Sequence, residues 1–138
     1  MKPYYLVGLI CIFTVAACGH LAVKDTSTSL ESRVVELWEI KKKSDWHGAY
    51  SFFCKNYRDQ VSRDHFVERA NLRIFSFQLE AIEHQPETQT AMVTLKFDTN
   101  IQGFDIPGVV TKERWVYEEN SWYICPGPSV GTTFFKKN

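Results

Sequence analysis

The sequence predicts an α+β fold in which helices come first and about four antiparallel strands follow. Two observations carry this prediction. Apolar residues recur at helical spacing between residues 30 and 70, and from Arg73 onward they alternate with a period of two. The chain has 138 residues, a length that fits one domain. We expect this domain to span residues 30–125.

The first expected helix carries an apolar stripe at positions i, i+4, i+7 and i+8, formed by Leu30, Val34, Leu37 and Trp38. The Lys41–Lys43 run suits the negative end of the helix dipole, and a solvated helix end is favoured over a site for anionic lipid.

Two further helices are expected before the strands. Ser44-Asp45 is suited to cap one helix, in which Trp46, Ala49, Tyr50 and Phe53 recur at helical spacing. Ser62 is suited to cap the other, where Val61 and Phe66 occupy the positions of a hydrophobic staple.

Four strands are expected after Arg73. In the first, Phe75, Phe77, Leu79 and Ala81 share one face and Ile74 lies on the other. In the second, Ala91, Val93, Leu95 and Phe97 form one apolar face, which is typical of a half-buried antiparallel strand. A turn over 103–108, a third strand over 109–118, a turn over 119–121 and a last strand over 122–125 complete the sheet.

The N-terminus reads as an export signal. Lys2 precedes an uncharged run over residues 4–17. As a helix this run would be roughly 21 Å long, too short for roughly 30 Å of hydrocarbon. A short apolar run behind a positive charge is typical of a secretory signal, so we assign residues 1–17 to a signal peptide.

The end of that run, Val15-Ala16-Ala17-Cys18, resembles the lipobox of bacterial lipoproteins. The resemblance implies cleavage before Cys18, diacylglycerol on its thiol and acylation of the new N-terminus, which together hold a protein stably on a membrane. Gly19 stands where an Asp favours inner-membrane retention, which implies the outer membrane, facing the periplasm, for a Gram-negative host. Residues 18–29 are then the lipidated cysteine and a polar tether, and residues 126–138 form a tail rich in turn residues.

Two cysteines of the expected domain remain, Cys54 and Cys125. An exported protein can keep disulfides, and a bridge here would be worth up to roughly 4 kcal/mol on the chain-entropy model. Two separately buried thiols are the alternative. Both interpretations stay open, because the distance between the two residues decides.

Composition excludes several classes of function. Sixteen basic residues balance sixteen acidic ones, so the charge expected of a general nucleic-acid binder is missing. The four histidines, His20, His47, His65 and His84, lack the spacing of a metal site. No Gly-rich phosphate loop occurs either. We therefore expect neither a metal nor a cofactor.

The following motifs resemble the nuclear transport factor 2-like (cystatin-like) superfamily, and in particular its small bacterial lipoproteins and cell-envelope domains: Val35-x-x-Trp38, Ser44-Asp45-Trp46-x-x-Ala49-Tyr50, Ser62-Arg63-Asp64-x-Phe66 and 114–124 (RWVYEENSWYI). The resemblance covers residues 30–125. It implies a cone, in which the N-terminal helices pack in the concave face of a strongly curved antiparallel sheet and a pocket lies between them. Members include isomerases, dehydratases and many non-catalytic envelope domains.

Within such a cone, the pocket candidates are Trp38, Tyr50, Glu113, Trp115 and Tyr117. If Trp115 and Tyr117 face inward, Glu113 does too, since alternate residues share a face. A carboxylate in an aromatic pocket is a candidate catalytic group. The favoured alternative is that Glu113 is solvated at the rim or pairs with an arginine such as Arg73.

These observations lead to one expected function and two alternatives. We expect a non-catalytic, lipid-anchored envelope protein that binds a small apolar ligand or a partner protein. The alternatives are a pocket enzyme of the isomerase or dehydratase type that uses Glu113, and a homodimeric structural module.

Overall fold

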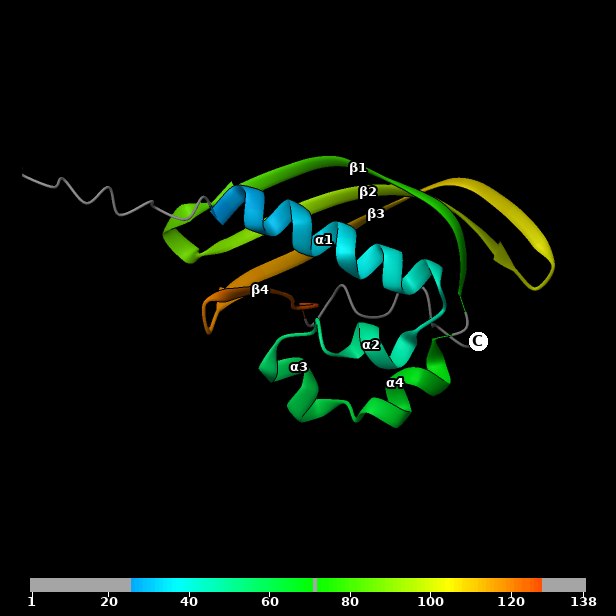
Figure 1. The fold of residues 1–138 in the computed structure, drawn as a ribbon, viewed down its shortest axis with the longest axis horizontal. Coiled ribbons are helices and arrows are strands. Elements are labelled where there is room, and N and C mark those ends of the chain that lie inside the picture. Colours follow the sequence, from blue (N-terminus) through cyan, green and yellow to red (C-terminus); the bar gives the residue numbers. More distant parts are fainter. Residues whose placement is uncertain (1–25, 71, 128–138) are drawn as a thin grey trace, which may run out of the picture.

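The structure is a computed structural model that describes residues 26–70 and 72–127. The expected signal peptide, Cys18, most of the expected tether and nearly all of the expected tail lie outside the described residues. The described part is an α+β fold, with an N-terminal helical part packed on an open sheet of four antiparallel strands (Figure 1). The predicted fold class is confirmed at this level.

Among the described residues, all four α-helices precede the four strands in the chain. They are α1 (Thr26–Lys42), α2 (Trp46–Tyr50), α3 (Lys55–Gln60), α4 (Arg63–Arg69), β1 (Arg73–Gln85), a 3-10 turn (Pro86–Thr88), β2 (Thr90–Ile101), β3 (Phe104–Glu118) and β4 (Ser121–Ile124). The sheet has the order β1-β2-β3-β4 and curves over one side of α1, whereas α2–α4 lie on the other side of α1 (Figure 1).

Helix α1 buries the stripe that its sequence predicts. Leu30, Val34 and Leu37 are fully buried and Trp38 is 2% exposed. The helix begins at Thr26, four residues before the expected domain boundary, so the end of the expected tether is helical. The apolar stripe by itself does not require this extra turn, because the first four N–H groups of a helix have no intrahelical partner and Leu30 could stand in the first turn. The Ser and Thr residues before Leu30 are weak helix formers, so the sequence does not predict this earlier start of the helix.

Two of the three short helices begin at the caps that the sequence indicates. The carboxylate of Asp45 accepts from the Gly48 N–H at 2.9 Å, and the hydroxyl of Ser62 accepts from the His65 N–H at 3.3 Å. Helix α3 was not expected, because it carries no apolar stripe. Exposed i,i+4 pairs, such as Lys55 with Asp59, support it instead.

The sheet confirms the predicted face of β2 and corrects that of β1. Ala91, Val93, Leu95 and Phe97 are all buried. In β1, irregularities between Ile74 and Ser76 and between Leu79 and Ala81 shift the register. Ile74 is consequently buried and Phe75 is 42% exposed, the reverse of the expected alternation.

The expected turn over 103–108 is also wrong. The turn is confined to Gln102 and Gly103, whose φ angles of 54° and 90° are the two positive values that a tight hairpin requires. Strand β3 therefore begins at Phe104, which pairs with Ile101. This hairpin extends past the helical part (Figure 1), and Phe104 near its tip is 74% exposed.

The edge strand β4 is tied to the segment between α2 and α3. The Cys54 N–H donates to the Ile124 carbonyl and the Ile124 N–H donates to the Phe52 carbonyl, both at 2.9 Å. A disulfide joins Cys54 to Cys125, with an S–S distance of 2.08 Å and Cα atoms 5.2 Å apart. Of the two interpretations that the sequence left open, the structure has the bridge.

Candidate functional site

A cavity of ≈ 400 Å³ lies between the helices and the inner face of the sheet. Its walls come from α1, from the α2–α4 region and from β1, β2 and β3. The buried part of the wall consists of Trp38, Phe53, Ile74, Phe97 and Glu113. Exposed side chains of Gln60, His65 and Arg69 stand at the mouth. The cavity is thus apolar inside, with one acidic group in its wall.

Glu113 is held by three donors from two elements. Its Oε2 accepts from the indole N–H of Trp38 at 3.3 Å and from that of Trp115 at 3.2 Å, and its Oε1 accepts from Lys41 Nζ at 2.9 Å. Glu113 is 7% exposed. The carboxylate is therefore a buried, hydrogen-bonded group rather than a solvated one at the rim.

The cation that partners Glu113 is Lys41 and not Arg73. The Lys41 side chain is only 12% exposed, and its Nζ lies 4.5 Å from the centroid of the Trp38 ring. It leaves the last turn of α1 toward the sheet, whereas the neighbouring Lys42 and Lys43 are exposed. Arg73 is exposed, and its guanidinium lies over the ring of Phe75. The expectation of a wholly solvated lysine run is wrong at Lys41.

The five pocket candidates separate into three groups. Trp38 and Glu113 line the cavity. Trp115 is fully buried and contacts the site through its hydrogen bond to Glu113. Tyr50 and Tyr117 do not line it. The Tyr50 hydroxyl donates to the Val61 carbonyl at 2.6 Å, and Tyr117 packs on Trp122 at a ring distance of 5.2 Å.

An aromatic cluster from α3, α4 and the segment before α3 forms a wall that the sequence did not assign to the site. Phe53 lies 4.6 Å from Tyr57 and 5.0 Å from Phe66, measured between ring centroids. Tyr57 is half-buried, and this burial raises the pKa of its phenol above the usual 10.0. The sequence predicted that Phe66 packs inward, because it belongs to the hydrophobic staple at Ser62. It gave no such prediction for Tyr57, because α3 has no periodic apolar pattern.

The arrangement can enclose an apolar molecule and offer it few polar contacts. Lys41 has three N–H donors, and one of them bonds Glu113. Across residues 26–70 and 72–127, no group of three or more His, Cys, Asp or Glu side chains could hold a metal ion. In the same part of the chain, no helix has both the length and the apolar character needed to cross a bilayer.

Comparisons with known proteins do not assign the chain to a group. No protein-family model matches the chain, and no curated protein sequence matches it.

Proposed function

We propose that this chain is a non-catalytic, lipid-anchored cell-envelope protein of the nuclear transport factor 2-like fold, and that it binds a small apolar ligand in the cavity between α1 and the sheet. The observation that carries the proposal is the cavity itself. Its volume of ≈ 400 Å³ is within the range of roughly 300–1,000 Å³ that is typical of small-molecule sites.

The lining favours binding of an apolar body. Its buried part includes the aromatic rings of Trp38 on α1 and Phe97 on β2. The aliphatic side chain of Ile74 on β1 adds to the same apolar surface. Each apolar Å² that a ligand removes from water is worth roughly 25 cal/mol. The Lys41–Glu113 ion pair is a polar group in an otherwise apolar wall, and a hydrogen bond to it would orient a ligand.

The bonding of Glu113 favours binding over catalysis. A general base needs a lone pair that can reach the proton it removes. Both indole N–H groups occupy Oε2, and Lys41 occupies one side of Oε1. Glu113 is thereby fixed in place by the fold, as a structural group of the wall. For this reason a binding site is preferred to an isomerase-type or dehydratase-type site.

The anchor rests on the lipobox-like Val15-Ala16-Ala17-Cys18. The Cys54–Cys125 disulfide is consistent with an exported protein, because such bridges persist in oxidising compartments. We place the lipid on Cys18, and the folded domain on the periplasmic side of the outer membrane if the host is Gram-negative. In the source cell, Cys18→Ser should accumulate as an unprocessed precursor without fatty acid. Normal maturation of this variant would refute the anchor.

Thermal unfolding of the full chain with decan-1-ol and with 2-naphthol tests the ligand site. A ligand at one hundred times its Kd adds about 2.7 kcal/mol, which corresponds to a rise in Tm of roughly 10–20 °C for a domain of this size.

A matched pair of variants identifies the site of binding. Ala70 lines the cavity, so the indole of Ala70→Trp should occupy most of its volume and abolish the rise in Tm. Ala81 is exposed on β1 and does not line the cavity, so Ala81→Trp should keep the rise. An equal rise in both variants, or no rise in the wild-type chain, contradicts the proposal.

A further inference from the structure

The charges around the cavity are distributed unequally between its wall and its mouth. Glu113 is the one acidic side chain among the described residues that line the cavity, and Lys41 neutralises it at 2.9 Å. Arg69 lines the mouth from the last turn of α4 and is exposed. No acidic side chain in the described part of the chain forms an ion pair with it.

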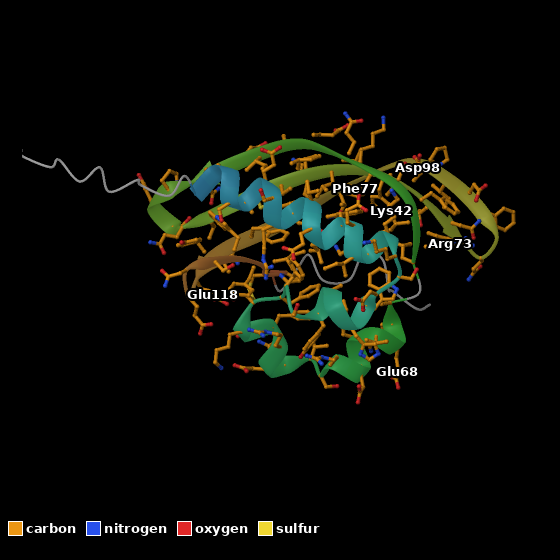
Figure 2. The ribbon with its side chains drawn as sticks, viewed as in Figure 1. Lys42, Glu68, Arg73, Phe77, Asp98 and Glu118 are labelled. Carbon is orange, nitrogen blue, oxygen red and sulfur yellow. A yellow bond between two sulfur atoms is a disulfide. The ribbon has the colours of Figure 1, made fainter. Side chains whose placement is uncertain are left out.

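Glu68, the acidic neighbour of Arg69 in the chain, does not neutralise the positive charge at the mouth. Glu68 precedes Arg69 on α4 but does not line the cavity. Figure 2 shows its side chain on the side of α4 that faces away from the sheet. His65, one helical turn before Arg69, also lines the mouth and adds ring N–H donor capacity there. The mouth therefore combines a cation that has no ion-pair partner among residues 26–70 and 72–127 with a second nitrogen donor.

The cavity volume limits the size of an occupant. At roughly 30 Å³ for each water-sized group, ≈ 400 Å³ accommodates about 13 non-hydrogen atoms. This is the size of a ten-carbon chain with a small head group. A much larger molecule would have to extend through the mouth.

We propose that the ligand is a carboxylate-bearing amphiphile of about this size, whose hydrocarbon body lies against Trp38, Phe53 and Phe97 and whose carboxylate meets Arg69 at the mouth. The proposal rests on the apolar-ligand function above and adds the chemistry of the head group. A guanidinium matches a carboxylate with two parallel N–H donors. A cationic head group would instead meet Arg69 as a like charge, which disfavours binding.

Calorimetric titration with three probes of equal chain length tests the head group. Decanoate, decan-1-ol and decylamine are titrated into the full chain, with the same detergent or lipid background in every sample. Ala70→Trp serves as the blank, because its indole should leave no room in the cavity for a ten-carbon chain, whereas partition of the probes onto the protein surface continues. We expect decanoate to bind roughly two- to fivefold more tightly than decan-1-ol, the upper part of the range for an exposed ion pair, because the guanidinium can bond both carboxylate oxygens. Decylamine should bind most weakly.

Variants of Arg69 test whether its guanidinium binds the carboxylate of the ligand. Arg69→Gln should reduce the affinity for decanoate to that for decan-1-ol without changing the affinity for decan-1-ol. Arg69→Lys should restore part of the preference, because it restores the charge but not the planar fork. Arg114 is exposed on β3 and does not line the cavity, so Arg114→Gln is the matched control and should keep the preference.

The outcomes separate this inference from the function on which it rests. If decan-1-ol binds as tightly as decanoate, or decylamine binds more tightly, the apolar-ligand function stands and the carboxylate inference is overturned. If Arg69→Gln keeps the full preference for decanoate, Arg69 is not the group that binds it and the inference is likewise overturned. If no probe binds beyond the Ala70→Trp blank, the proposed function fails as well.

Discussion

Lys41 Nζ lies 2.9 Å from Glu113 Oε1, and this contact joins the last turn of α1 to the middle of β3. The two side chains are 12% and 8% exposed. A charge pair buried to this degree depends on both members, because removal of one leaves the other in a poorly solvated position. The pair therefore couples the helix to the sheet at the cavity wall.

Removing the cation should destabilise the fold. Lys41→Met leaves Glu113 without its charged partner and should cost about 2–4 kcal/mol in urea unfolding. Adding Glu113→Gln to Lys41→Met should recover about 1 kcal/mol, because an amide oxygen still accepts from the two indoles and no buried charge remains.

Lys42→Met is the control. Lys42, the next residue of α1, is exposed, and its loss should change stability by less than about 0.5 kcal/mol. Equal effects of Lys41→Met and Lys42→Met would contradict the prediction.

The disulfide should contribute a large share of the stability. Cys54 and Cys125 are 71 residues apart, and a cross-link over such a loop is worth about 4 kcal/mol on the chain-entropy model. The double variant Cys54→Ser/Cys125→Ser should lose about 2–4 kcal/mol against the oxidised wild-type chain. A reductant should destabilise the wild-type chain to a similar extent and leave the double variant unchanged. An unchanged Tm of the wild-type chain under reductant would refute the contribution.

The core stripe of α1 offers a matched pair of substitutions. Leu37 is fully buried and Val35 is 39% exposed. Leu37→Ala should cost about 2–5 kcal/mol, because it removes buried methyl groups and leaves a cavity. Val35→Ala should stay within about 0.5 kcal/mol of the wild-type chain. Denaturant unfolding with an unchanged m-value measures both, and a comparable loss in Val35→Ala would show that the helix is packed on a different face.

Stability should fall in acid partly through Asp98. The Gly108 backbone N–H and the Ser76 hydroxyl both donate to its carboxylate, and they hold the pKa of Asp98 below the usual 3.8. A lowered pKa in the folded state favours the ionised form, so this contribution is present above the unfolded pKa and is lost as pH falls through the folded one.

Two variants test this acid dependence. Asp98→Asn should lose less stability than the wild-type chain between pH 5 and pH 2, because it has no proton to take up. Ser76→Ala removes one donor and should raise the Asp98 titration midpoint toward its usual value, as observed by carbon-detected NMR. Identical acid profiles for Asp98→Asn and the wild-type chain would exclude the contribution.

Part of the fold follows from local pattern. The apolar spacing of Leu30, Val34 and Leu37 marked the buried face of α1, and strict alternation marked that of β2. Caps at Asp45 and Ser62 marked two helix starts. These predictions succeeded because periodicity and capping are properties of neighbouring residues.

Other features of the fold gave no local signal. The irregularities in β1 placed Ile74 inside and Phe75 outside, and they depend on pairing with β2 rather than on the sequence of β1 alone. The narrow turn at Gln102–Gly103 was obscured by the proline and second glycine that follow it. Helix α3 lacked any stripe, because Tyr57 and the polar Gln60 are its two residues that line the cavity.

For the site, the sequence by itself determined which residue types were available: inward-facing Trp38 and Glu113, two cysteines and a lysine run at a helix end. Tertiary structure decided how they meet. It selected Lys41, 72 positions away, as the partner of Glu113, joined Cys54 to Cys125, and left Tyr50 and Tyr117 outside the cavity. The physical reason is that a contact between distant residues depends on how whole elements pack, and chain spacing carries no information about that distance.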